Sequence, residues 1–221
     1  MAIKPILFNT EMVRAILEGR KTCTRRVIKP QWEECPACKY VHNEYIYDKM
    51  AENVYCARCG CPLEPERRSP YQPGDILYVR ETWQYLYELD GNEQVIEGTG
   101  KYYYAATDTI PFDTYVDENG VKHDHAPWKP SIHMPKEAAR IWLKVTDVRV
   151  ERLQDITADD IRREGLSSMA VHAGDMEIAL KEWETLWNNT IKKSDIDRYG
   201  WDANPWVWVI GFERCEKPQE V

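Results

Sequence analysis

Apolar residues recur at helical spacing near the start of the chain, in the stretch NTEMVRAILEGRK. Val13, Ile16 and Leu17 share one helical face, which is the pattern of a helix packed against a core. Thr10 is the expected N-cap, and Gly19 suits a left-handed exit from the last turn. The pattern therefore predicts a short amphipathic helix that ends at Gly19.

Two more helices are predicted in the C-terminal part of the chain. In ITADDIRREGL, Thr157 is the expected N-cap and Gly165 the expected end. Ile156 and Ile161 occupy the two positions of a hydrophobic staple. A longer amphipathic helix follows, with its apolar residues at helical spacing: Met176, Ala179, Leu180, Trp183, Leu186 and Trp187.

Extended segments surround these helices. Alternating or continuous apolar patterns predict strands over residues 22–28, 76–83, 100–107, 141–150 and 204–214. A bulge is expected near Asp147, where the alternation of the fourth segment shifts. Several strands with a few helices between them indicate the α+β class, most simply a small β-barrel with peripheral helices.

Two stretches lack this periodicity and are interpreted as insertions. Residues 32–70 carry paired cysteines and several prolines, and residues 84–127 include a polar, turn-rich part with DENG (117–120) as the expected hairpin tip. The barrel is then expected to comprise 1–31 and 71–215.

Charge and hydropathy narrow the functional classes. The 221 residues carry a formal net charge of −8, which argues against a protein that coats long polyanions. The balance reverses locally, because residues 14–29 hold six basic side chains against the single acid Glu18. This basic patch favours a focused anionic or polar ligand. The chain has no apolar run long enough for a membrane span and no secretory signal, so a soluble cytoplasmic protein is expected.

The cysteine spacing predicts a structural zinc site. CPAC and CARC place Cys35, Cys38, Cys56 and Cys59 as two C-x2-C pairs separated by seventeen residues. Two such turns can face each other and complete a tetrahedral sulfur site, which leaves no open position for catalysis. Cys61 is an alternative to Cys59.

Several strings resemble the ASCH domains, a branch of the PUA-like β-barrels that is associated with RNA and nucleotide ligands. They are Gly19-x-Lys21 with Arg26, PGDILYVRETW, KVTDVRVERL and a helix ending in REG. PSIHMP and YGWDANPWVWVI are similar to strings of the longer members encoded by phages and prophages. The resemblance implies a PUA-like barrel and a nucleoside, modified base or single-stranded RNA as partner.

One branch of that family removes the acetyl group from N-4-acetylcytidine, and its string G-x-K-x-x-T-x-R is similar to the segment after Gly19. The resemblance assigns catalytic roles to Lys21, Thr24 and Glu164 and places Arg26 beside them. In such a set, threonine is the nucleophile and a lysine of lowered pKa or a glutamate moves protons. Lys21 and Thr24 would point to opposite faces of an unbroken strand, so they can line one pocket only if Lys21 belongs to the turn after Gly19.

Further substrate-binding candidates are Arg25, Glu81, Trp83 and His133. Trp83 beside a carboxylate can stack a base, although a place in the core explains it equally well. Each candidate also has an ordinary structural interpretation. Three other functions stay open: a non-catalytic reader of RNA or modified bases, a ribonuclease that uses the same pocket, and a phage assembly protein.

Overall fold

A computed structural model provides the structure of the protein. It describes residues 1–29, 31, 35, 37–39, 45–48, 53–62, 69–88, 90–92, 94–110, 115–116, 121–123, 128–166 and 173–219. In chain order, its elements are β1 (Ile3–Leu7), α1 (Thr10–Leu17), β2 (Cys23–Val27), β3 (Tyr45–Asp48), β4 (Asn53–Cys56), β5 (Ile76–Arg80), β6 (Trp83–Leu86), β7 (Lys101–Tyr104), β8 (Tyr115–Val116), β9 (Lys122–His123), β10 (Trp142–Arg152), α2 (Ala158–Arg163), α4 (Met176–Thr190), α5 (Ile196–Tyr199) and β11 (Trp206–Cys215).

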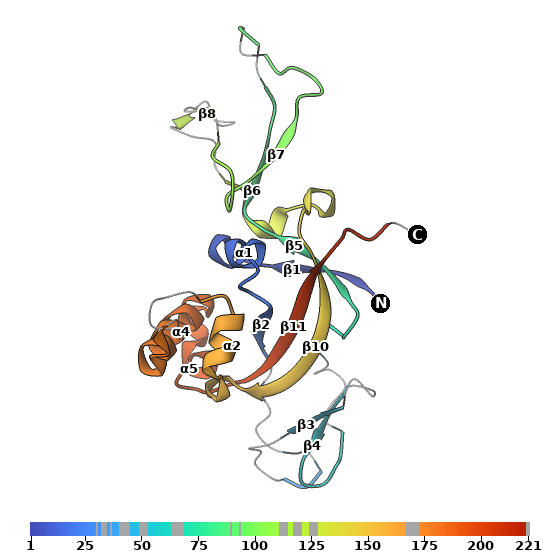
Figure 1. Cartoon of the computed structure of the whole chain (residues 1–221), viewed down its shortest axis with the longest axis vertical. Coiled ribbons are helices and arrows are strands. Elements are labelled where there is room, and N and C mark those ends of the chain that lie inside the picture. Colours follow the sequence, from blue (N-terminus) through green and yellow to red (C-terminus); the bar gives the residue numbers. More distant parts are fainter. Residues whose placement is uncertain are drawn as a thin grey trace.

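A five-stranded mixed sheet forms the body of the molecule, in the order β1-β5-β10-β11-β2. β1 runs parallel to β5, and the other neighbours are antiparallel. The register of β10 against β11 shifts between Val145 and Asp147, so the predicted bulge is confirmed. β10 and β11 bend together through the centre of the molecule (Figure 1). The predicted α+β class is confirmed.

The two edge strands of this sheet are joined by a side chain. Nη2 of Arg26 on β2 donates to the carbonyl oxygen of Leu7 at the end of β1, at 2.8 Å. Between them lies the main apolar core, to which β1, β5, β10 and β11 contribute, including Ile6, Leu143 and Ile210. The sheet therefore curls around its core.

Helices cover the outer face of the sheet beside β2 and β11 (Figure 1). A second apolar cluster joins Ile161 of α2 and Trp183 of α4 to Val207 and Val209 of β11. The Thr157 cap is confirmed, and it forms a capping box with Asp160.

The expected cap of α1 was wrong by one residue. Asn9 is the N-cap, and its side chain accepts from the Met12 backbone N–H at 2.8 Å, while Thr10 is the first helical residue. Asn and Thr are both good caps, so residue type alone could not place the boundary. The left-handed Gly19 after the helix, with φ 77°, is confirmed.

The predicted strand over 76–83 is divided in the structure. β5 belongs to the large sheet, whereas β6 pairs with β7 in a separate hairpin that projects from the body (Figure 1). β3 pairs with β4, and β8 with β9, as two further hairpins. The expected tip at 117–120 lies outside the described residues. Among the described helices, none is long and apolar enough to cross a membrane.

Candidate functional site

Two left-handed glycines bring distant segments together at the candidate site. Gly19 turns the chain out of α1, and Gly165, with φ 98°, turns it out of α2. A Cβ at Gly165 would lie 2.8 Å from Cβ of Ala15 and 3.0 Å from Cβ of Lys21. Only glycine therefore combines this backbone conformation with so close an approach. The end of α2 consequently docks directly against Lys21.

Lys21 and Glu164 form a buried ion pair at this junction. Lys21 Nζ lies 2.6 Å from Oε2 of Glu164 and donates a second bond, at 2.9 Å, to the Glu164 carbonyl oxygen. The two side chains are 0% and 2% exposed. The pair holds the lysine as an ammonium beside a carboxylate, in a medium that screens their attraction poorly. An ammonium has three N–H donors, and these two bonds account for two of them.

Lys21 lies before β2, which begins at Cys23. This is the condition under which Lys21 and Thr24 can line one pocket. Thr24 is buried opposite Ile210 of the main core, and Arg26 lies two residues further on the same face. The Lys21 ammonium lies 5.6 Å from the centre of one aromatic ring, that of Phe8, and the Arg26 guanidinium lies 5.5 Å from the same ring.

Arg26 also neighbours Tyr71, whose hydroxyl donates to the Pro5 carbonyl oxygen at 2.9 Å. Burial lowers the pKa of Arg26 and raises that of Tyr71. The Thr24 hydroxyl has no hydrogen-bond partner within the described part of the chain. Lys21, Thr24, Arg26 and Tyr71 thus gather on the Phe8 side of β2.

Arg25 points to the opposite face of β2, toward α2 and α4. Its side chain is fully buried, and Nη1 lies 3.2 Å from Oε1 of Glu164. Burial alone would lower the pKa of Arg25, but the carboxylates of Glu164 and Glu151 raise it above its ordinary value. Cys23 shares this face, where burial and then Glu164 raise the pKa of its thiol to about 12. Cys23 is therefore a protonated thiol at neutral pH and unsuited to act as a nucleophile.

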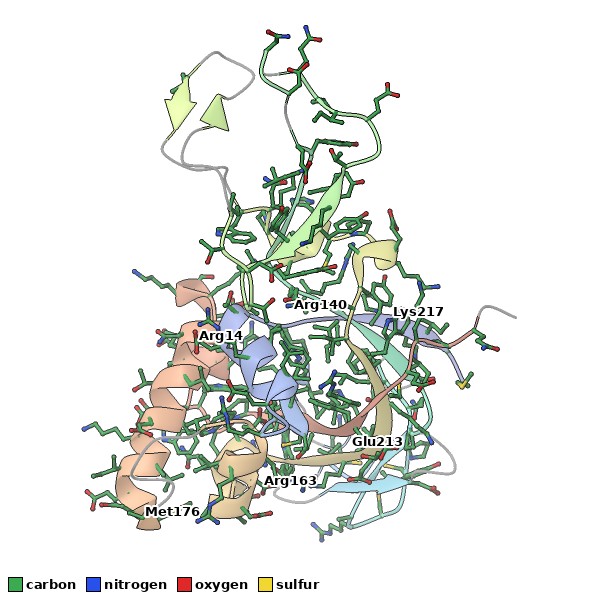
Figure 2. All side chains as sticks on the ribbon, turned by 45° about the horizontal axis from the view of Figure 1, so that its top comes forward. Arg14, Arg140, Arg163, Met176, Glu213 and Lys217 are labelled. Atoms are coloured by element: carbon green, nitrogen blue, oxygen red, sulfur yellow. The ribbon has the colours of Figure 1, made fainter. Side chains whose placement is uncertain are left out.

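Glu81, Trp83 and His133 lie away from this pair, around the base of the β6–β7 hairpin. Both carboxylate oxygens of Glu81 are 2.9 Å from nitrogens of Arg140, which stacks over Tyr104 at 4.0 Å. Figure 2 shows Arg140 where the hairpin meets the body. Trp83 is buried in an apolar cluster with Met134 and Trp142, and His133 is exposed. The structure does not bring these three residues to the Lys21–Glu164 pair.

The cysteines of the 32–70 segment converge at the β3–β4 hairpin. The sulfurs of Cys35, Cys56, Cys59 and Cys61 lie within 4.8 Å of one another and can hold a metal ion. Cys38 Sγ lies 3.8 Å from Cys56 Sγ, so five thiols lie close together, whereas a structural zinc ion takes four ligands.

The two C-x2-C turns have matching geometry. The residue four positions after the first cysteine is left-handed in both, with φ 57° at Lys39 and 68° at Gly60. In both, its backbone N–H donates to the carbonyl of that first cysteine: Lys39 to Cys35 at 2.9 Å and Gly60 to Cys56 at 2.8 Å. The shared conformation turns each pair of thiols toward a common point, which C-x2-C spacing alone only suggests.

Sequence reasoning missed Phe8, Tyr71 and Arg140. No local pattern marks Phe8, because its place beside Lys21 and Arg26 depends on how β1 and β2 meet across the core. Arg140 lies 59 residues from Glu81 in the chain. In ARIWLKV, Arg140 directly precedes a buried strand, and a charged residue at such a position often has a buried partner. This was a weak indication of the pair with Glu81.

No family model and no curated protein matches the chain. The chain is similar to the crystal structure of an ASCH domain from Lactobacillus crispatus JV V101, with a TM-score of 0.38 and 9% sequence identity over 96% of this chain and 79% of that chain. At this score, the two backbones diverge over much of their length. The fold described above therefore stands on the sheet order and core of this chain.

Proposed function

We propose that the protein binds a nucleoside or modified base beside the Lys21–Glu164 pair and hydrolyses an exocyclic amide such as that of N-4-acetylcytidine. The observation that carries the proposal is the buried 2.6 Å contact between these two side chains. Thr24 on β2, three residues after Lys21, supplies a buried hydroxyl that has no hydrogen-bond partner among the described residues. The similarity of the G-x-K-x-x-T-x-R string to the ASCH amidohydrolases supports the same set of residues.

The ion pair suggests how the roles divide. Since Lys21 is held as an ammonium, we assign it the third N–H as a donor to the amide oxygen, where charge develops during attack. The Glu164 carboxylate accepts the Thr24 proton, and Thr24 Oγ1 bonds to the amide carbon. The C–N bond then breaks, and Glu164 returns the proton to the leaving amine. Water hydrolyses the resulting ester and restores Thr24.

The test is to incubate purified protein with N-4-acetylcytidine and to measure cytidine and acetate. Lys21→Met, Glu164→Gln and Thr24→Val should each lower the rate at least about a hundred-fold. Thr22→Val is the matched control, because the Thr22 hydroxyl contacts Arg163 Nε at 3.4 Å rather than the pair. Full activity in Thr24→Val would remove the nucleophile assignment. Nucleoside binding without acetate release would leave a reader of modified bases, and cleavage of single-stranded RNA would indicate a ribonuclease.

For the cysteine cluster, we propose a structural zinc ion held by Cys35, Cys38, Cys56 and Cys59. Zinc–sulfur bonds of about 2.3 Å place the sulfurs of a tetrahedron about 3.8 Å apart. The contacts Cys35–Cys59 and Cys38–Cys56, at 3.7 and 3.8 Å, have this length. Cys61 lies only 3.0 and 3.1 Å from Cys35 and Cys59, too close to share one ion with both. The matching turns favour the same four residues.

Metal analysis of purified variants distinguishes the two ligand sets. Cys61→Ser should retain about one zinc per chain, and Cys38→Ser should lose most of it. The opposite result would place Cys61 in the coordination sphere and Cys38 outside it. Less than about half an equivalent of zinc in the unaltered protein would remove the metal proposal.

A further inference from the structure

Behind the Lys21–Glu164 pair, four charged side chains form a closed ring: Arg25, Glu151, Arg149 and Asp160. Arg25 Nε lies 3.0 Å from Oε1 of Glu151, whose Oε2 lies 3.1 Å from Arg149 Nε. Arg149 Nη2 lies 3.2 Å from Oδ1 of Asp160, whose Oδ2 lies 3.3 Å from Arg25 Nη2. The ring joins β2, β10 and α2, and its two guanidinium groups balance its two carboxylates.

The geometry of the ring fixes the orientation of the charged groups in it. Each carboxylate gives one oxygen to each arginine, so neither carboxylate can rotate without losing a contact. A guanidinium presents its donors as a rigid planar fork. With Nε and Nη2 of Arg25 fixed in the ring, the direction of Nη1 is fixed as well. Nη1 contacts Oε1 of Glu164 at 3.2 Å.

The surroundings of the ring restrain Arg25 and Asp160, whereas the Arg149 side chain is 33% exposed. Asp160 belongs to the capping box of α2, where its side chain also accepts from the Thr157 hydroxyl at 2.9 Å. The Arg25 guanidinium lies 6.0 Å from the ring of Trp183, which packs over it from α4. Figure 2 shows Arg163 on α2, the helix of Asp160, and Arg163 Nη1 approaches Oδ1 of Asp160 at 4.0 Å. The ring is thus anchored to the first turn of α2 and to strands β2 and β10, and Trp183 packs against its Arg25.

We propose that this ring positions the Glu164 carboxylate, and that Arg25 is a positioning residue rather than a ligand of the substrate. Glu164 has one oxygen on Arg25 and the other on Lys21, so the plane of its carboxylate is set from both sides. A base held in this way keeps one orientation toward the nucleophile. The consequence for catalysis rests on the proposed amide hydrolysis, whereas the consequence for the geometry of the pair does not.

Arg149→Gln tests the inference, because Arg149 closes the ring and contacts neither Glu164 nor Lys21 in the described structure. The readout is the side-chain ammonium signal of Lys21 in ¹H–¹⁵N spectra, which burial makes observable. Arg162→Gln is the matched control, since Arg162 lies on the exposed face of α2. Urea unfolding of each variant verifies that it is folded under the conditions of measurement.

We expect the Lys21 signal to shift or broaden in Arg149→Gln and to stay in place in Arg162→Gln. Arg25→Lys, which keeps the charge but cannot contact three carboxylates, should move it as well. For N-4-acetylcytidine, kcat should fall about ten- to a hundred-fold in Arg149→Gln with little change in KM, because misplacement rather than lost binding slows the reaction.

An unchanged Lys21 signal in folded Arg149→Gln would overturn the inference. So would a loss of activity that follows the unfolded fraction alone, since a purely structural ring predicts that behaviour. If the unaltered protein hydrolyses no acylated nucleoside while the Lys21 signal moves as expected, the proposed function fails and the positioning of Glu164 stands.

Discussion

Replacing the two members of the Lys21–Glu164 pair should have unequal effects on stability. Glu164→Gln leaves the Lys21 ammonium buried, and no other carboxylate contacts it within the described residues. Lys21→Met leaves the Glu164 carboxylate with its second cation, Arg25, at 3.2 Å. The charge that loses every opposite partner is the lysine. The glutamine variant should therefore be the less stable of the two.

The magnitude follows from burial. Removing one partner of a buried ion pair costs about 3–5 kcal/mol, mainly because the remaining charge is desolvated without compensation. With side-chain exposures of 0% and 2%, the upper range applies to Glu164→Gln. Lys21→Met should cost about 1–3 kcal/mol, because the two hydrogen bonds to Glu164 are lost but no buried charge is left without an opposite partner. The double variant should be more stable than Glu164→Gln, because no ammonium is then left buried.

Urea unfolding followed by tryptophan fluorescence measures these differences. The matched control is Glu11→Gln. Glu11 contacts Arg14 at the same 2.6 Å distance, but its side chain is 77% exposed. That substitution should cost less than about 1 kcal/mol. If Glu164→Gln costs no more than Glu11→Gln, or if the double variant is less stable than both single ones, the reasoning from burial is refuted.

Two further predictions concern titration. The pKa of Cys23 is raised to about 12. Iodoacetamide at pH 8 should therefore modify Cys23 in urea but not in the folded protein, as peptide mass spectrometry would detect. Labelling of Cys23 in the folded protein would contradict the assignment. Burial raises but hydrogen bonds and cations lower the pKa values of Asp75 and Asp160, and the net direction is below the ordinary 3.8. Both carboxylates then contribute their full stabilisation above pH 3.8 and lose it as the pH falls through their lowered pKa values. The free energy of unfolding should therefore decline below about pH 4, and the decline should be less steep in Asp75→Asn.

Local signals predicted the elements of the body well. The staple and cap around Thr157, the left-handed Gly19 and Gly165, and the shift near Asp147 each depend on a few neighbouring residues. The division of residues 76–83 between two sheets has no such local origin. The alternation continues through the break, and only the pairing of Trp83 with Tyr104 decides where β6 belongs. β1 was missed because a five-residue strand with one proline gives a weak period-2 signal.

The candidate site shows the same contrast between local signals and contacts that only the fold creates. The resemblance to the ASCH amidohydrolases proposed Lys21, Thr24 and Glu164, and their spacing could not tell whether a lysine three residues before a threonine shares its face or points away from it. The answer depends on the chain leaving α1 through Gly19, so that β2 begins only at Cys23. Arg25 shows the converse difficulty: its basic neighbourhood suggested a ligand contact, whereas the structure surrounds it with carboxylates from β10 and α2.

The surrounding charges also change which residue suits the role of base. Burial and neighbouring cations both favour a neutral lysine, and an adjacent carboxylate opposes them. On the α2 side of β2 the cations have carboxylate partners: Arg25 has Glu151 and Asp160, and Lys21 has Glu164. The balance favours an ammonium and a carboxylate over two neutral groups. A base that is already an anion and a donor that is already a cation need no proton exchange before attack, so we assign proton transfer to Glu164 and stabilisation of the developing oxyanion to Lys21.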